Sequence, residues 1–220
     1  MKTTLLVLAL NELEGMRVIM PKIQRDWVDE ILVVDGGSTD GTIEYAESLG
    51  IKVVRQKTKG IHAAYWEGLA VATGDVIIPF SPDGNSVAEK IPELVAKMRE
   101  GYDMVIVSRY LDGAKSEDDN IPTAIGNWFF TTLINVLFGG HYTDSLVMFR
   151  AWKRSLVDEF LFPPTIAGFE PQLAIECVKR GRKVTEIPGD EPKRISGERK
   201  TDPYSASIKM LRLIAKEWWS

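Results

Sequence analysis

Short apolar runs alternate with segments of helical spacing through the first half of the chain. The runs are rich in Val, Ile and Leu, and the strands that they predict cover 4–10, 31–34, 52–54, 76–80 and 103–108. The segments with helical spacing cover 15–25, 41–49, 61–73 and 87–100. Strands buried on both faces and separated by helices predict an α/β fold, with a mostly parallel sheet flanked by helices.

The pattern changes after residue 110. A polar loop at 112–122 precedes an apolar stretch at 125–140, which predicts one helix. A second helix, a short strand, a charged loop containing Gly and Pro, and a last helix are expected at 168–181, 183–187, 189–203 and 204–218. The length suits one domain over 1–220, with 1–110 and 111–220 as its two parts.

Polar residues directly follow the predicted strands. Asn11 and Glu12 follow the first, Asp35 the second, Asp83 the fourth and Arg109 the fifth. Ligands of open α/β sheets bind beyond the carboxyl ends of the strands. These residues are therefore the first candidates for a functional site.

The segment VVDGGSTDGT at 33–42 is the strongest local motif. It predicts a buried strand, a glycine turn and a helix capped by Ser38 or Thr39. Glycines let the backbone approach a ligand closely, and the start of a helix offers free N–H groups to an anion. Asp35 would then accept hydrogen bonds from a base or ribose. The alternative is a capped turn with a solvated carboxylate.

Asp83 and several basic residues extend this candidate site. A carboxylate at the end of the fourth strand can hold a divalent cation that bridges a diphosphate, although Pro82-Asp83-Gly84 also suits an ordinary turn. Arg109, at a strand end, and the basic loop 193–200 are placed to bind an anionic substrate. A charge run in a loop is otherwise simply solvated.

Composition narrows the function classes. The chain is 45% hydrophobic with a formal net charge of -4, which argues against nucleic acid as the main partner. The single cysteine, Cys177, is expected to pack in a helix. The N-terminal apolar run predicts a first strand rather than a leader sequence, and no run reaches the ~20 residues that span a bilayer. We therefore expect no integral membrane segment.

Taken together, the motifs resemble the family 2 glycosyltransferases of GT-A fold, especially the dolichol-phosphate mannose synthase and polyprenyl-phosphate glycosyltransferase branch. The resemblance covers nearly the whole chain. It rests on the order and spacing of ALNE at 9–12, VVDGGSTDGT at 33–42, the spaced Gly60, Ala64, Gly68, Ala72 and Gly74-Asp75, SRY at 108–110, FRAW at 149–152, GFE at 168–170 and RISGERK at 194–200.

The resemblance implies a Rossmann-like GT-A fold with a C-terminal acceptor region in 111–220. It implies inverting transfer of a mannose-like or glucose-like sugar from a GDP- or UDP-sugar to a polyprenyl or dolichyl phosphate. Asp83, with Asn85, would bind Mg²⁺ or Mn²⁺, and Arg109, Arg194 and Lys200 would hold phosphates. The residues expected to line the nucleotide pocket are Ala9, Asn11, Glu12, Asp35, Gly37, Ser38, Gly60 and Asp83.

The chain departs from the branch at several positions. Ser81 replaces the first acid of the Asp-x-Asp motif, so we expect weaker metal binding. Gly36 replaces an acid that often contacts the nucleobase, which leaves the donor base open. The other departures are Asn85 for a common Gln, Ile61-His62 for a usual Lys-Gly, Trp66 for a common Arg and Val147-Met148 for a usual Ser-Gly.

Two segments suggest contact with a membrane surface. The stretch 125–140 is aromatic and apolar, and the last predicted helix combines Trp218 and Trp219 with Lys209, Arg212 and Lys216. Both suit a helix in the headgroup region, and equally core or dimer packing. The branch often carries C-terminal membrane helices, which this sequence does not reach. We therefore expect a cytoplasmic enzyme, peripheral on the membrane face or recruited by a membrane subunit.

Two other functions stay open. One is family 2 transfer to a soluble sugar or glycan, which would need a carboxylate base such as Asp144 or Glu170. The other is a non-catalytic nucleotide-sugar-binding relative, suggested by the loss of the acids at Ser81 and Gly36 and opposed by Asp83, Arg109, Arg194 and Lys200.

Overall fold

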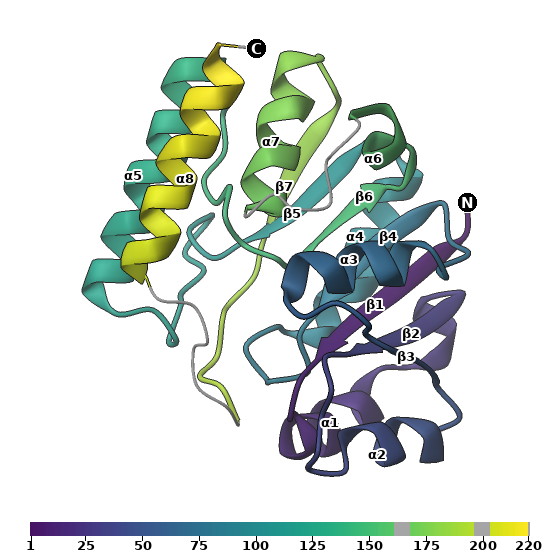
Figure 1. Cartoon of the computed structure of the whole chain (residues 1–220). Helices are drawn as coiled ribbons and strands as arrows, with labels where there is room; N and C mark the ends of the chain where they lie inside the picture. Colours follow the sequence, from purple (N-terminus) through teal and green to yellow (C-terminus); the bar gives the residue numbers. More distant parts are fainter. Residues whose placement is uncertain (161–167, 196–202, 220) are drawn as a thin grey trace.

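Seven strands form one sheet in a computed structural model that describes residues 1–160, 168–195 and 203–219. The strand order is β3-β2-β1-β4-β6-β5-β7, and only β6 runs antiparallel to its neighbours. Figure 1 shows the sheet crossing the molecule between two layers of helices. The strands are β1 (Thr3–Ala9), β2 (Glu30–Asp35), β3 (Lys52–Arg55), β4 (Val76–Phe80), β5 (Met104–Ser108), β6 (Arg150–Lys153) and β7 (Val184–Pro188).

Eight α-helices flank the sheet in the described part of the chain. The expected β-α alternation through residue 110 is confirmed. The predicted helix 15–25 is shorter, because α1 is followed by short 3-10 turns at Met20–Lys22 and Arg25–Trp27. The α-helices are α1 (Leu13–Ile19), α2 (Thr42–Ser48), α3 (Ile61–Leu69), α4 (Ile91–Arg99), α5 (Ile121–Phe138), α6 (Ser155–Phe160), α7 (Phe169–Lys179) and α8 (Pro203–Trp218).

The strands bury both of their faces, as the apolar runs predict. Neighbouring residues of β1 point to opposite sides: Leu5 and Val7 pack with α1, α2 and α4, whereas Leu6 packs with α3, α5 and α7. All three side chains are fully buried. The carboxyl ends of the parallel strands thus lie along one edge of the sheet, called here the carboxyl edge. The turns that follow β1, β2 and β4 lie at this edge.

The sequence pattern missed two elements of the second half, β6 and α6. Strand β6 has only four residues, with Arg150 at one end and Lys153 at the other, so it lacks the apolar run of a buried strand. Arg150 is nevertheless fully buried. Its guanidinium donates to the carbonyl oxygens of Ser145 and Glu170 at 3.0 and 3.1 Å, and also to that of Val147. These bonds satisfy the buried cation and fix the segment 145–147.

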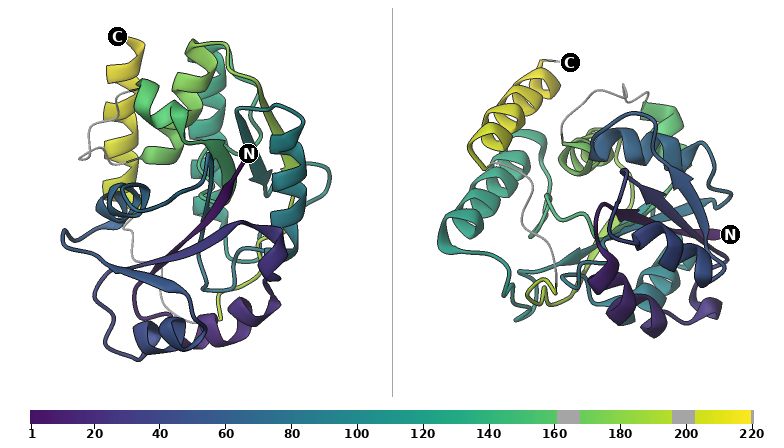
Figure 2. Two further views of the ribbon diagram at one scale, coloured as in Figure 1. Left: turned by 90° about the vertical axis from the view of Figure 1, so that its right-hand side faces the viewer. Right: turned by 60° about the horizontal axis from the view of Figure 1, so that its bottom comes forward.

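Helices α5 and α8 lie side by side at the outer edge of the helical layer (Figures 1 and 2). The ring centroids of Phe138 and Trp218 are 5.9 Å apart, so the carboxyl ends of the two helices meet. A capping box of Asn120 and Thr123 starts α5 at Ile121, earlier than the predicted 125, because each side chain bonds the other residue's backbone N–H.

Helix α5 differs from a normal surface helix in having polar residues inside and large apolar residues outside as well. Its buried face carries the polar Asn127 and Thr131 beside the apolar Phe130 and Ile134. On its outer face Ile121, Trp128 and Val136 are more than 60% exposed. Over its 18 residues the mean hydropathy is 1.3, so its length and composition would allow it to cross a membrane. Core helices of other proteins share this property, so the expectation of no integral membrane segment stays a prediction.

Candidate active site at the carboxyl edge of the sheet

The turns that follow β1 and β2 are bonded to each other. Asn11 adopts a left-handed conformation (φ 54°), its backbone N–H donates to Ser38 Oγ at 2.7 Å, and its Oδ1 accepts from the N–H of Thr39 at 2.9 Å. The N–H of Gly36 donates to the carbonyl oxygen of Ala9 at 2.9 Å. Ala9, Asn11, Gly37 and Ser38, predicted from separate motifs, therefore lie together.

Asp35 builds the turn that follows it. Its Oδ1 accepts from the backbone N–H groups of Gly37 and Ser38, both at 2.8 Å, and its Oδ2 accepts from the Ser38 hydroxyl at 2.6 Å. The residue is fully buried. These three hydrogen bonds show that Asp35 stabilises the turn. Contact of Asp35 with a nucleotide stays a prediction.

The predicted cap of α2 is wrong. The helix begins at Thr42 after Gly41 in a left-handed conformation, and Ser38 turns back to Asp35 instead. Asp40 is bonded at this point, because its Oδ1 accepts from the N–H of Thr42 and its Oδ2 from that of Leu13. The prediction therefore placed the helix start too early, and the N-cap position is Gly41, which has no side chain to cap the helix.

Glu12 and Gly60 complete the nucleotide side of the edge. The N–H of Glu12 donates to the Thr42 hydroxyl at 3.0 Å, and the residue is buried. Gly60 precedes α3 with φ 109°, and its carbonyl oxygen accepts from Gln56 Nε2 at 2.6 Å. The Oε1 atom of the same Gln56 amide lies against Gly36. The loop before α3 thus reaches the turn after β2.

Asp83 lies against α1, the helix that follows β1. A Cβ on Gly15 would come within 2.2 Å of the Pro82 carbonyl oxygen, so only glycine permits this approach. Asp83 is 3% exposed, and its Oδ1 accepts from the N–H of Asn85 at 3.2 Å. The structure thus brings Asp83 to the same edge as Asn11 and Asp35.

Arg194 reaches Asp83 from the segment after β7. Its Nη1 lies 3.3 Å from Asp83 Oδ2, and its Nε donates to Asp118 Oδ2 at 3.0 Å. Hydrogen bonding to Asp118 and the charge of Asp83 raise the pKa of the guanidinium, although burial acts against them. Arg194 therefore stays cationic. Lys200, the third predicted phosphate ligand after Arg109 and Arg194, lies outside the described residues.

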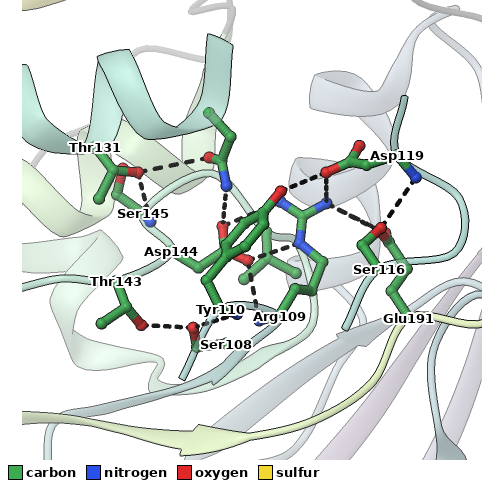
Figure 3. Close-up of polar contacts among 12 residues, drawn as sticks. Ser108, Arg109, Tyr110, Ser116, Asp119, Thr131, Thr143, Asp144, Ser145 and Glu191 are labelled. Carbon is green, nitrogen blue, oxygen red and sulfur yellow. Dashed lines mark hydrogen bonds and ion pairs between the residues drawn. The ribbon is translucent and has the colours of Figure 1, made fainter. Parts of the chain in front are cut away.

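Arg109 is surrounded by carboxylates, as Figure 3 shows. Its Nε and Nη2 donate to the two oxygens of Asp144 at 2.6 and 3.0 Å, and its Nη1 donates to Glu191 at 3.1 Å. Asp119 lies 3.6 Å from the same Nη1. We expected Arg109 to hold a phosphate, which stays a prediction. In this structure each of its guanidinium nitrogens already faces a carboxylate.

Neighbouring side chains hold these carboxylates in place (Figure 3). Asn127 Nδ2 from α5 donates to Asp144 Oδ1 at 3.0 Å, the Tyr110 hydroxyl donates to Asp119, and the Ser116 hydroxyl donates to Glu191. Burial raises the pKa of the Glu191 carboxyl, and the charge of Arg109 opposes that shift. The network therefore explains the polar inner face of α5.

The sequence did not identify Asp118, Asp119 and Glu191 as partners of the two arginines. All three lie in charged segments that the sequence treats as loops. With Asp83 and Asp144 they give five carboxylates around two guanidinium groups, a formal excess of three negative charges when all are ionised. A diphosphate could bind at such a place only with additional positive charge.

Another polar group lies between α3, α7 and α8. The Tyr65 hydroxyl donates to Glu170 Oε1 at 2.7 Å, and the rings of Tyr65 and Phe169 stack with centroids 4.5 Å apart. Burial and the charge of Lys209 lower the pKa of the neighbouring His62, whereas Glu170 acts to raise it. Cys177 packs in α7 as expected, and burial raises the pKa of its thiol to about 12.

Comparisons with known proteins agree with this architecture. Solved structures of glucosyl-3-phosphoglycerate synthase from Mycobacterium tuberculosis, including one with Mn²⁺, uridine diphosphate and phosphoglyceric acid, superpose with a TM-score of 0.76 at 22% identity, over 99% of this chain and 78% of that one. At this identity the likeness shows the fold, so the expected GT-A architecture is confirmed.

Curated relatives are similar over most of the chain. Glycosyltransferase AglJ of Haloferax volcanii is 30% identical over 81% of this chain, and dolichyl-phosphate hexose transferase of the same organism is 27% identical over 94%. An undecaprenyl-phosphate 4-deoxy-4-formamido-L-arabinose transferase of Salmonella paratyphi B is 32% identical over 78%. The matches span 59%, 89% and 52% of these relatives' own lengths, respectively.

The family assignment rests on the central part of the chain. Residues 23–161 match the family described as glycosyl transferase family 2. This range contains the turn after β2, the Asp83 turn and the Arg109–Asp144 pair. The chain therefore belongs to glycosyl transferase family 2.

Proposed function

We propose that the chain transfers a sugar from a nucleoside diphosphate sugar to a polyprenyl phosphate, with inversion and with Mg²⁺ or Mn²⁺. GDP and UDP are the candidate nucleotides, and a mannose-like or glucose-like hexose is the candidate sugar. The observation that carries the proposal is the position of Asp83. Gly15 of α1, from the first half of the chain, lies against its backbone, and Arg194, from the second half, pairs with its buried carboxylate.

The donor would lie on the turns after β1, β2 and β3. These turns present Asn11, Ser38 and Gly60 along one edge, with glycines at the closest approaches. Parallel sheets bind nucleotides in this position. Asp35 would act mainly by shaping the Gly37–Ser38 turn, because its oxygens accept three bonds there.

The described residues fit a divalent cation that is shared with the substrate. They contain no group of three or more His, Cys, Asp or Glu side chains able to hold a metal by themselves. Mg²⁺ typically binds through one or two carboxylates plus substrate phosphates and water. Asp83 and the neighbouring Asn85 would supply the protein ligands, and the guanidinium on Asp83 Oδ2 shows that this oxygen accepts a cation. Bound there, the metal would stabilise the departing diphosphate.

The acceptor's own chemistry removes the need for a strong base. A phosphate monoester loses its second proton with a pKa of about 6, so it is largely an oxyanion at neutral pH. Asp144, one candidate base, is fully buried and bonded to Arg109 and Asn127. It is better placed to orient those side chains than to take a proton.

The apolar faces of α5 and α8 are suited to the membrane surface in which such a lipid lies. Ile125 and Trp128 of α5 and Leu211 and Trp218 of α8 are exposed on adjacent helices. Lys209, Arg212 and Lys216 of α8 are exposed as well and would face anionic headgroups. We therefore place the enzyme at a membrane surface, bound through these helices or through a membrane subunit.

The names of the relatives support this acceptor class. Two of them are named for transfer to dolichyl phosphate and to undecaprenyl phosphate. Both names describe those proteins; for this chain the acceptor is an inference.

Turnover with defined substrates tests the proposal. The purified chain is incubated with GDP- and UDP-hexoses, Mn²⁺ and a short polyprenyl phosphate, and the released nucleoside diphosphate and the glycolipid are measured. We expect both products from at least one donor. Tight nucleotide binding without turnover of any donor would favour a non-catalytic binding protein instead.

The competing enzyme is a family 2 transferase with a soluble sugar or glycan acceptor. Its base would be Glu170, which accepts a hydrogen bond from Tyr65 and stays partly exposed. Loss of transfer in Glu170→Gln with intact donor binding would favour this alternative. Under the lipid-phosphate proposal the same variant keeps most of its activity.

A further inference from the structure

Arg194 occupies the oxygen of Asp83 that a metal would use. Its Nη1 lies 3.3 Å from Oδ2, while Oδ1 accepts the backbone N–H of Asn85. The Asp83 side chain is 4% exposed. A carboxylate this buried needs a nearby positive charge, because removing its partner leaves the charge unsolvated and uncompensated.

The backbone around Arg194 is fixed to the same turn. The N–H of Ile195 donates to the carbonyl oxygen of Asp83 at 2.8 Å. The Ile195 side chain lies over Gly84, where a Cβ would come within 2.7 Å of it. Arg194 therefore starts from a defined backbone position, so that only its side chain has to move to leave Asp83.

Asp118 holds the other side of the guanidinium. Its Oδ2 accepts from Arg194 Nε at 3.0 Å, an interaction separate from that of Nη1 with Asp83. The guanidinium can therefore release one carboxylate and keep the other. Such a two-point arrangement retains the cation beside Asp83 after it has left the oxygen.

We propose that Arg194 is a tethered cation that a divalent metal displaces from Asp83, and that the displaced guanidinium, kept near by Asp118, then binds the donor diphosphate. The inference rests on the proposed metal site at Asp83. A guanidinium and a metal ion at the same Oδ2 repel each other, so the binding of one weakens the binding of the other. Binding of metal and binding of diphosphate are thereby coupled through one side chain.

The test is a pair of titrations that measure the affinity for Mn²⁺ and the affinity for uridine diphosphate. Replacement of Arg194 should change these two affinities in opposite directions. Mn²⁺ binding is measured by the electron paramagnetic resonance signal of the free ion, first without nucleotide. We expect Arg194→Gln to bind Mn²⁺ about tenfold more tightly than the wild type, which corresponds to ~1.4 kcal/mol. With saturating Mn²⁺, the same variant should bind uridine diphosphate about tenfold more weakly, because a charged phosphate contact is lost. A purely structural role for Arg194 would weaken both.

Two further variants serve as controls. Arg180→Gln removes a partly exposed guanidinium that pairs with the largely buried Glu176 on α7, and it should leave both affinities unchanged. Asp118→Asn loosens the tether but keeps Arg194, so it should tighten Mn²⁺ binding less than Arg194→Gln does. If circular dichroism shows that Arg194→Gln is unfolded, the two titrations are made with Asp118→Asn instead, and tighter Mn²⁺ binding than in the wild type is again the expected result.

The outcomes separate the inference from the proposed metal site. Equal or weaker Mn²⁺ binding by Arg194→Gln overturns the exchange alone, provided that the wild type binds Mn²⁺ with nucleotide. Absence of Mn²⁺ binding by every variant, even with uridine diphosphate, overturns the metal site together with the inference. Tighter Mn²⁺ binding with unchanged nucleotide affinity refutes the transfer of Arg194 to the diphosphate.

Discussion

Arg109 and Arg194 lie at the same edge of the sheet but in different surroundings. Arg109 comes directly from β5, its side chain is 11% exposed, and its nitrogens face Asp144, Glu191 and Asp119. Arg194 comes from the segment after β7, its side chain is 25% exposed, and it pairs with Asp83 and Asp118. The same residue type is thus fixed in one place and exchangeable in the other.

The difference shows that a strand-end arginine is not by itself evidence of a phosphate site. Asp144 is completely buried, so Arg109 compensates a charge that water cannot reach. It links β5 to α5 through Asp144, which also accepts a hydrogen bond from Asn127, and it links β5 to the segment after β7 through Glu191. We infer that Arg109 mainly positions these segments, while Arg194 is the arginine available to the substrate.

The largest expected effect is on stability, in Arg109→Gln. Removing the guanidinium leaves the buried Asp144 without its counter-charge, so the free energy of unfolding should fall by about 3–5 kcal/mol. Urea denaturation at neutral pH measures this. Arg55→Gln, whose ion pair with Glu47 is exposed on both sides, should cost less than about 1 kcal/mol. A similar, small loss in both variants would contradict the structural role of Arg109.

Asp83→Asn should affect catalysis more than folding. The amide keeps the shape of the side chain but removes the charge that holds the cation. We expect the transfer rate to fall about 100- to 1,000-fold, the range seen when one electrostatic stabiliser is removed. Steady-state kinetics at saturating donor and Mn²⁺ provide the measurement. Wild-type activity in this variant would exclude Asp83 as the metal ligand.

Arg194→Gln should lower kcat/KM by about 10- to 100-fold, the loss of one charge-assisted contact of ~1.5–3 kcal/mol. Its free energy of unfolding should fall as well, because the buried Asp83 loses its counter-charge, but by less than in Arg109→Gln, because the Arg194 side chain is more exposed than that of Arg109. The double variant with Asp83→Asn should be less impaired than the sum of the two predicts. Strict additivity would show that the two residues act independently.

The smallest expected effect concerns pH and His62. Burial lowers the pKa of His62 in the folded chain below 6.5, so the unfolded chain binds more protons below that pH. The wild type should therefore lose stability as the pH falls from about 6.5 towards the folded-state pKa. Over the same pH range the His62→Gln variant should lose less stability than the wild type, and the difference should be under ~1 kcal/mol. Melting temperatures at several pH values check this, and identical pH profiles would contradict it.

The sequence predicted the first half of the site because local patterns determine it. Apolar strands place their following residues at one edge, so Asn11, Asp35 and Asp83 could be brought together from periodicity alone. Arg109 illustrates the limit. Its partners Asp119, Asp144 and Glu191 come from three separate segments, and no local pattern shows that a charged loop will fold onto a buried arginine.

The second half was harder for the same physical reason. Strand β6 begins with Arg150, and a charged residue normally predicts an exposed position. Arg150 can be buried here because the surrounding carbonyl oxygens accept hydrogen bonds from its guanidinium. Helix α5 has apolar residues on both its buried and its exposed face, and Asn127 and Thr131 are buried with Phe130 and Ile134, so its hydrophobic pattern indicates the helix but not which face is buried. In both cases tertiary contacts override the local signal.

The most direct test of the proposed function is a comparison of two acceptors that differ only in the phosphate. Transfer from the best donor to a polyprenyl phosphate is measured beside transfer to the same polyprenol at pH ~7.5, well above the phosphate pKa of about 6. We expect the alcohol to react at least ~100-fold more slowly, because the proposed site has no side chain that acts as a general base. General base catalysis contributes a factor of about 100 to 10,000 to the rate. Equal rates with both acceptors, or a preference for the alcohol, would contradict transfer to a lipid phosphate.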